Sequence, residues 1–438
     1  MSTRDTSPYP SPAAAWYVVA VFMLAYTFSY LDRSILTLMV APIRASLGIS
    51  DTQLSLLHGL AFAIFYTLLG IPIGRLADRH NRVRIMAVGV FFWSLMTALC
   101  GLARNFTQMF LFRVGVGVGE AALSPSAYSI IADYFPPQRL PYAMSVYTAA
   151  LYVGSGLALI AGGTLIGMVQ PMELPIVGHM EPWQLVFLWV GLPGLLVVLL
   201  LGTVKEPVRR GVLQRDGGPV MPLRVVIRYI VNRRGAYGLM MAGYASLGLA
   251  YNGVSAWVPT YFIRVHHWTA KDAGLRFGLM LAIVGTVGIL SGGALAAWLK
   301  GRGHRSGNVM VGVIAALIAL PTGAIAPLIG DAQISLMVYG VFVFGASLPF
   351  GAAAAAFQEL TPNQMRGQVT AIYFFCVNLA GIGLGPTVVA LFTDRVFGND
   401  TSVYLSCAIV PTIMTPIAAV LLWLSLKPFA RATSEAEF

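Results

Sequence analysis

Four charged side chains lie inside apolar stretches of the chain. Asp32 and Arg33 stand next to each other in the first long apolar stretch, and Arg113 and Glu120 lie in the fourth. A charge at bilayer depth costs roughly 2.5–3.5 kcal/mol on insertion scales, so such residues are rare and usually functional. A buried carboxylate can take up and release a proton, and an arginine can pair with that carboxylate or with a bound anion.

The spacing of these residues makes cross-pairing between the two helices geometrically possible. Arg113 and Glu120 are seven residues apart, so they share one face of a helix at a separation of roughly 10 Å along its axis. If the first and fourth helices run in opposite directions, Arg33 can pair with Glu120 while Asp32 pairs with Arg113. We predict that Asp32, Arg33 and Glu120 couple protons to a conformational change. The alternative is a static cluster that holds the two helices together.

The composition indicates an integral membrane protein. Of the 438 residues, 57% are hydrophobic and only 10% are charged, whereas soluble domains have roughly 25% charged residues. The cysteines lie in apolar stretches and predict neither a disulfide nor a metal site. Apolar runs long enough to span a bilayer predict an all-α protein with twelve transmembrane helices. They cover residues 14–41, 53–77, 85–103, 107–132, 141–169, 183–204, 235–263, 273–299, 308–330, 333–357, 368–393 and 402–426.

The net charge of +11 follows the membrane topology and does not indicate nucleic-acid binding. Most of the lysines and arginines fall in the segments that lie on the same side as the two termini. The positive-inside rule therefore predicts a multi-pass protein of the inner (plasma) membrane with both termini in the cytoplasm. The opposite side carries few basic residues, namely Arg44, Arg104, Arg264, Lys271 and Arg395.

A long polar interval divides the chain into two halves. We predict an N-terminal tail at 1–13, a six-helix bundle at 14–204, a cytoplasmic linker at 205–234, a second six-helix bundle at 235–427 and a C-terminal tail at 428–438. Residues 221–231 of the linker have one basic and one apolar face, which predicts a helix lying on the inner leaflet. The helix caps at Ser50 and Thr269 recur about 220 residues apart, as in a transporter built from two like halves.

The segment Gly74 to Arg84 joins the second and third helices in a short turn. Asn81 suits a turn because it tolerates a left-handed backbone. Asp78 is acidic among arginines, and it can meet the positive N-terminus of the eleventh helix. We expect that helix to be capped by Thr361.

This segment resembles the signature G-x-L-A-D-R-x-G-R-R/K of the major facilitator superfamily, with Asn81 in place of the second glycine. The resemblance implies two six-helix, pseudo-symmetric bundles that rock about a central site. It also implies that Asp78 belongs to a cytoplasmic gate. The predicted gate consists of charged residues near the ends of helices in both halves, namely Arg75, Asp78, Asp133, Arg139, Glu359 and Arg366. We expect Glu359 to pair with Arg366.

The first half also resembles the spinster-like lipid transporters of that superfamily. The residues that carry this resemblance are Tyr30 to Arg33, Arg113 to Ala121, Ser124-Pro125 and the stretch from Ile131 to Pro136. Organic-anion carriers of the same superfamily have a similar Asp-Arg pair in the first helix. The resemblance implies an amphipathic lysolipid or a sphingoid-phosphate-like substrate, and a small organic anion is the alternative.

The predicted substrate site combines the two arginines with polar and aromatic residues of both halves. These residues are Arg33, Arg113, Tyr147, Asn252, Trp257, Phe375 and Asn378. Asn252 and Asn378 can equally hold helices together. We expect a monomeric secondary transporter that works by alternating access, has the lipid bilayer and protons as partners, and needs no cofactor. An enzyme would need a catalytic constellation and a channel would need polar rings or a filter loop, and the sequence contains neither.

Overall fold

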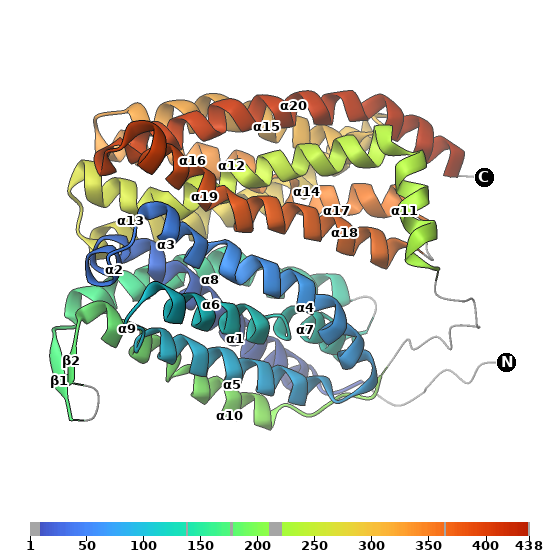
Figure 1. Cartoon of the computed structure of the whole chain (residues 1–438). Coiled ribbons are helices and arrows are strands. Elements are labelled where there is room, and N and C mark those ends of the chain that lie inside the picture. The colour runs from blue at the N-terminus through green and yellow to red at the C-terminus, as the bar shows by residue number, and fades with distance from the viewer. Residues whose placement is uncertain (1–8, 137–138, 176–177, 210–220, 363–364, 437–438) are drawn as a thin grey trace.

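The computed structural model describes residues 9–136, 139–175, 178–209, 221–362 and 365–436. Over these ranges the chain is almost entirely helical, and one short hairpin forms a two-stranded antiparallel sheet. The long helices lie side by side in two groups (Figure 1). We call the group from α1 to α10 the N-half and the group from α12 to α20 the C-half.

The N-half begins with a capped helix, since the Ser11 side chain accepts a hydrogen bond from the Ala14 backbone N–H at 3.3 Å. The elements of this half are α1 (Pro12–Leu38), α2 (Val40–Leu47), α3 (Asp51–His58), α4 (Leu60–Arg79), α5 (Arg82–Cys100), α6 (Phe106–Glu120), α7 (Leu123–Tyr134), α8 (Leu140–Met168), β1 (Met172–Leu174), β2 (Gly178–Met180), α9 (Pro182–Gly191) and α10 (Gly194–Thr203).

The C-half follows the short helix α11 (Leu223–Asn232). It includes three π-helical segments, which often mark functional positions in long helices. Its elements are α12 (Arg234–His266), α13 (Ala270–Met280), η1 (Leu281–Gly285), α14 (Thr286–Gly301), α15 (Gly307–Ile325), η2 (Ala326–Leu328), α16 (Ala332–Ser347), α17 (Pro349–Leu360), α18 (Arg366–Asn378), η3 (Leu379–Leu384), α19 (Gly385–Leu391), η4 (Phe392–Phe397), η5 (Asp400–Ser402) and α20 (Val403–Ala436).

The predicted twelve-helix architecture is confirmed. Within the described residues, 10 helical segments are long and apolar enough to cross a membrane. The pair α6–α7 and the long helix α12 supply the fourth and seventh spans. The fourth span was expected to be continuous, but it is interrupted at Ala121 and Ala122. Pro125 explains the break, because a proline inside a helix clashes with the carbonyl four residues earlier. The boundaries of the five predicted domains stay predictions.

The two ends of the bundle carry different elements (Figure 1). Helix α1 begins and α20 ends at one end, where α11 also lies, and we call this end the terminal face. The opposite end carries α2 and the β1–β2 hairpin, and we call it the hairpin face. Helix α2 stops at Gly48, whose φ of 64° is readily adopted by glycine.

The halves approach each other closely along two seams. Span 2 is interrupted at Gly59, between α3 and α4, where a Cβ atom would lie 2.6 Å from the Gly383 carbonyl oxygen of η3. On the other side of the bundle, a Cβ atom on Gly156 of α8 would lie 2.4 Å from the Gly278 carbonyl oxygen of α13. Only glycine permits such backbone contact, so both seams depend on these positions.

The helix caps confirm some predictions and correct others. The predicted caps at Ser50 and Thr269 are confirmed: Ser50 forms a capping box with Gln53, and Thr269 caps α13. Asn81 does not adopt the left-handed conformation, because its φ is −65° and its side chain instead caps α5. The predicted cap at Thr361 is also wrong, since α18 begins at Arg366. The Thr361 hydroxyl already donates to the Phe357 carbonyl at the end of α17.

Candidate functional site

Both pairings of the buried charges that the spacing allows are present. The Arg33 Nε donates to Glu120 Oε2 at 2.9 Å, and its Nη2 also contacts that oxygen. The Arg113 Nη1 donates to Asp32 Oδ2 at 2.9 Å. The Ser29 hydroxyl donates to the same Glu120 oxygen that binds Arg33. Two antiparallel helices, α1 and α6, therefore supply a cluster of two acids and two arginines, which we call the charge cluster.

Helix geometry explains why the pairs cross. Neighbouring residues on α1 point about 100° apart, so Asp32 and Arg33 address different partners. Arg113 and Glu120 lie on one face of α6 about two turns apart, and Arg113 is nearer the hairpin face. The Arg113 Nε also donates to the Leu57 carbonyl of α3 at 3.4 Å. The charge cluster thus touches three spans of the N-half.

The four members differ in their exposure. The side chain of Arg113 is fully buried and that of Asp32 is 2% exposed, whereas 16% of the Arg33 side chain is exposed. The cluster has no net formal charge when both acids are ionised. Removing one partner of a buried pair strands the other charge and typically costs about 3–5 kcal/mol. Arg33 is consequently the member whose side chain a bound molecule can reach with the least rearrangement.

Aromatic rings surround the Arg33 guanidinium. Its Cζ lies 4.1 Å from the centre of the Phe62 ring, 5.2 Å from that of Tyr30 and 5.3 Å from that of Tyr66. Cation–π contacts of this kind contribute roughly 0.5–2 kcal/mol each, with the larger values in desolvated sites. The rings hold the guanidinium in place and make its surroundings apolar.

The remaining predicted substrate residues are distributed over both halves. Tyr147 is buried in the N-half, where its ring stacks on Tyr26 at a centroid distance of 5.4 Å. The Trp257 indole N–H donates to the Pro386 carbonyl at 2.9 Å, so this side chain joins α12 to α19. Asn252 donates to the Gly248 carbonyl of its own helix at 2.9 Å. Phe375 and Asn378 are half-buried in α18. Their role in substrate binding stays a prediction.

The described side chains of the predicted gate residues near the terminal face have different surroundings. The Asp133 carboxylate is buried against Arg82 at 2.5 Å. Arg75 and Arg139 are exposed. The backbone of Asp78 lies in the last turn of α4, but its side chain lies outside the described part of the chain.

The expected pair of Glu359 and Arg366 is wrong. Glu359 is bound by Lys300 of α14 and by the Asn308 side chain of α15 at 3.0 Å. The Arg366 Nε instead donates to the carbonyls of Gln358 at 2.9 Å and Thr361 at 3.0 Å. An arginine that satisfies the last carbonyls of a helix is a common C-terminal arrangement.

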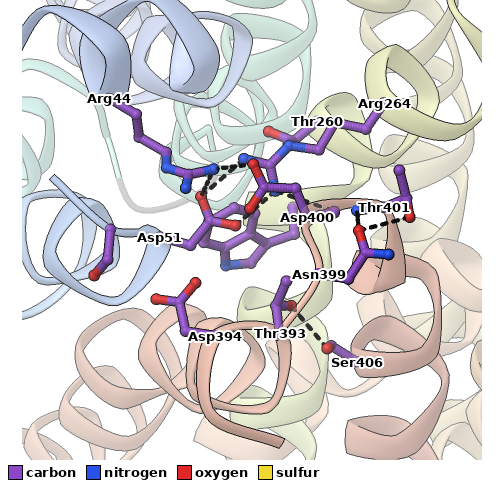
Figure 2. Close-up of polar contacts among 12 residues, drawn as sticks. Arg44, Asp51, Thr260, Arg264, Thr393, Asp394, Asn399, Asp400, Thr401 and Ser406 are labelled. Atoms are coloured by element: carbon purple, nitrogen blue, oxygen red, sulfur yellow. Dashed lines mark hydrogen bonds and ion pairs between the residues drawn. The ribbon is translucent and has the colours of Figure 1, made fainter. Parts of the chain in front are cut away.

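A second charged site, which the sequence analysis missed, joins the halves at the hairpin face (Figure 2). Asp51 of the N-half is fully buried and accepts two hydrogen bonds from Arg264 of the C-half, at 2.6 and 2.8 Å. The Arg44 Nη1 lies 3.1 Å from Asp51 Oδ1 and 2.6 Å from Asp400 Oδ2. We call these four residues, with Thr52 and Asp394, the hairpin-face network.

Asp394 binds the start of a helix in the other half. Its Oδ2 accepts hydrogen bonds from the Thr52 backbone N–H and from the Thr52 hydroxyl, both at 2.6 Å. Thr52 lies in the first turn of α3, where free N–H groups and the helix dipole favour a carboxylate. The C-half therefore supplies an acid to the N-terminus of an N-half helix.

The hairpin-face network is organised by its arginines. Oxygens of Asp51, Asp394 and Asp400 lie within 4.8 Å of one another, a spacing that also suits metal ligands. Here Arg44 and Arg264 lie among these acids and neutralise much of their charge. Burial lowers the pKa of Arg44, but the hydrogen bond to Asp400 and the charge of Asp51 outweigh burial and raise it. The one sequence signal for this site was the placement of Arg44 and Arg264 on the side of the membrane opposite the termini.

Further polar contacts between the halves lie at this face and in the middle of the spans. The Thr260 hydroxyl of α12 donates to the Thr37 carbonyl of α1 at 3.0 Å, and Ser55 donates to Thr387 at 3.2 Å. Deeper in the bundle, the hydroxyls of Tyr152 and Ser347 are 2.6 Å apart. These contacts hold the halves together toward the hairpin face.

Comparison with known proteins agrees with this geometry. Residues 22–386 match the family described as Major Facilitator Superfamily. The chain belongs to this superfamily. It is 27% identical over 435 residues to an MFS-type efflux pump of Mycolicibacterium smegmatis, covering 98% of this chain and 96% of that protein. It is 25% identical over 418 residues to protein spinster homolog 1 of Homo sapiens, covering 90% of this chain and 76% of that protein.

A solved structure supports the same conclusion. A bacterial homologue of the human lysosomal transporter Spinster, in an inward-facing and unoccupied conformation, superposes with a TM-score of 0.79 at 27% identity. The alignment covers 97% of this chain and 98% of that protein. The predicted resemblance to the spinster-like branch is confirmed, and the chain is a multi-pass membrane transporter of this superfamily.

The hairpin-face network makes a testable prediction about the contact between the halves. Asp51 pairs with Arg44 of its own half and with Arg264 of the C-half. The Arg264→Gln substitution removes the charge from the C-half, so the halves should separate at this face. We expect a longer distance, or a second and longer population, between spin labels on the exposed residues Thr107 of α6 and Gln333 of α16. Double electron–electron resonance in nanodiscs measures this distance.

The matched control is Arg395→Gln, which removes an exposed arginine from the same face. This control should leave the distance distribution unchanged. An unchanged distribution in Arg264→Gln as well would contradict a role for the network in holding the halves together.

Proposed function

We propose that this transporter couples protons to the movement of an anionic amphiphile, a lysolipid or a sphingoid-phosphate-like molecule, by alternating access. The observation that carries the proposal is the pairing of partly exposed Arg33 with buried Glu120. A single guanidinium at the edge of the cluster is thereby shared between a protonatable acid and a bound anion.

Charge balance supports the coupling. While Glu120 is ionised, Arg33 has a counter-ion and gains little from an added anion. When Glu120 takes up a proton, the carboxyl becomes neutral and Arg33 loses its counter-ion. An anionic group then restores neutrality at Arg33, so the proton and the anion bind the same state more tightly together than separately. The Asp32–Arg113 pair is more deeply buried and supplies a second acid for the same purpose.

The arrangement of the halves supports alternating access. The hairpin-face network and the Thr260–Thr37 contact hold the halves together at one end of the bundle. By the positive-inside rule, the arginine-rich terminal face lies on the cytoplasmic side of the inner membrane. Both termini are then in the cytoplasm. With that orientation, the closed end faces away from the cytoplasm. The similarity to an inward-facing homologue supports the same assignment.

The surroundings of Arg33 favour a substrate with both a charged and an apolar part. An arginine offers paired donors that suit phosphate and carboxylate groups. The rings of Phe62, Tyr30 and Tyr66 place this charge among apolar surfaces. A phosphate-bearing headgroup at Arg33 would therefore have apolar walls beside it for the start of an acyl chain.

The coupling predicts a specific effect of neutralising one acid. In the unmodified protein, uptake of the anionic amphiphile into proteoliposomes should depend on an imposed pH gradient. Glu120→Gln should remove this dependence, because the group that exchanges a proton is lost. The variant should also unfold at a lower temperature, since Arg33 loses its buried partner. Asp32→Asn is expected to act similarly through Arg113. Uptake and thermal unfolding are measured on the same preparations.

Glu206→Gln is the matched control, because Glu206 is also an acid paired with an arginine, Arg82, but lies near the terminal face. Its pH dependence should resemble that of the unmodified protein. If Glu120→Gln and Asp32→Asn both kept a normal response to the pH gradient, the charge cluster would have only a structural role.

The substrate class is tested by thermal stabilisation with two ligand series. Lysophospholipids or sphingosine phosphates should stabilise the protein increasingly with acyl length, and Arg33→Ala should abolish the effect. Arg33→Lys should weaken it, because an ammonium lacks the paired donors of a guanidinium. Stabilisation by short carboxylates alone, with no effect of acyl length, would favour a transporter of small organic anions.

A further inference from the structure

Helix α11 presents an apolar stripe away from the protein. Leu223, Ile227 and Val231 are spaced four residues apart, so they share one face of the helix. Their side chains are exposed by 55%, 47% and 55% respectively. The helix runs across the terminal face of the C-half and crosses the direction of the spanning helices (Figure 1). It leads directly into α12, so the stripe lies where a membrane span meets the lipid–water boundary.

The opposite edge of α11 is fixed to the C-half. Val226 is buried, and the Tyr229 hydroxyl donates to the Leu360 carbonyl at the end of α17 at 3.3 Å. Just before α11, the Met221 carbonyl accepts a hydrogen bond from the Gln368 side chain of α18 at 2.9 Å. The protein therefore holds the helix in one orientation while the stripe stays open.

Basic residues adjoin the apolar stripe. Arg224 and Arg228 each follow a stripe residue by one position and are exposed, and Arg233 and Arg234 come directly after the helix. No acidic residue lies between Met221 and Arg234. A helix with an apolar stripe beside a row of arginines is suited to the boundary between anionic headgroups and acyl chains.

We propose that α11 docks on the anionic phospholipids of the leaflet at the terminal face, with Leu223, Ile227 and Val231 among the acyl chains and Arg224 and Arg228 on the headgroup phosphates. Lipid is the occupant because the helix is continuous with a transmembrane span and the uncompensated charge is positive. Through Tyr229 and Gln368, the docked helix is joined to the end of α17 and to α18. The proposal is independent of which substrate the transporter moves.

The experiment measures how deeply α11 lies in the membrane. A nitroxide is attached at Ile227→Cys, with Cys376 replaced by alanine, and the full-length protein is placed in nanodiscs of phosphatidylcholine with or without phosphatidylglycerol. Relative collision rates with oxygen and with a polar nickel reagent report the depth of the label. We expect acyl-chain depth in discs that contain phosphatidylglycerol and a shallower position in pure phosphatidylcholine.

Removing the two arginines should have the same effect as removing the anionic lipid. Each basic residue near an anionic surface strengthens binding roughly fivefold, so Arg224→Gln with Arg228→Gln should weaken docking about 25-fold. The matched control, Arg84→Gln with Arg431→Gln, removes two exposed charges from the terminal face outside α11 and should leave the depth unchanged. A second label at Val231→Cys shows whether the first label itself perturbs the helix.

Three results would overturn the proposal. A label that faces water in both kinds of disc would show that the stripe is covered by neither lipid nor protein, and immobilisation without lipid contact would indicate a protein partner. A label at acyl-chain depth that is unaffected by phosphatidylglycerol and by the arginine substitutions would show apolar insertion without recognition of anionic headgroups.

Discussion

The organisation of this transporter depends on the need to neutralise four charges inside the N-half. Asp32, Arg33, Arg113 and Glu120 form two crossed ion pairs between antiparallel helices, and their formal charges cancel. Any change in the charge of one member must be compensated nearby, because an isolated charge at this depth is strongly unfavourable. Arg33 is the member with exposed surface, so it is where compensation by a bound anion is easiest.

A short helix connects this cluster to the contact between the halves. Helix α3 begins at Asp51 and Thr52, which bind Arg264 and Asp394 of the C-half. Near its other end, the Leu57 carbonyl accepts a hydrogen bond from Arg113. The break at Gly59 separates this helix of 8 residues from the rest of span 2. The hairpin-face network therefore contacts one end of α3, and the charge cluster contacts the region near its other end.

Local sequence rules were sufficient for much of this structure. Apolar run lengths predicted the spans. The seven-residue spacing of Arg113 and Glu120 showed that the crossed pairs were possible, because helix geometry puts both residues on one face. The break at Ala121 could also have been expected from Pro125. The Asn81 conformation was mispredicted because the same residue type suits both a left-handed turn and a helix cap.

The hairpin-face network could not be derived in the same way. Asp51 and Arg264 are 213 positions apart, and Arg44 and Asp400 are 356 positions apart. No periodicity relates residues of different halves, so their meeting depends on how the halves pack. The same applies to Glu359, whose partner Lys300 comes from a neighbouring helix whereas the sequence suggested the nearby Arg366. The charge cluster could be anticipated because buried charges within one half have few possible partners, whereas pairs between the halves depend on packing that the sequence does not encode locally.

The most direct test of the shared-arginine arrangement is the number of protons taken up when an anionic ligand binds. Isothermal titration calorimetry with a lysophospholipid, in buffers of different ionisation enthalpy at one pH, measures this number. If Arg33 releases ionised Glu120 and binds the ligand instead, Glu120 should take up a proton. Net uptake should approach one proton per bound ligand at a pH where Glu120 starts ionised. Glu120→Gln should reduce this uptake. Ligand binding to the unmodified protein without proton uptake would contradict the coupling of the proton to the anion.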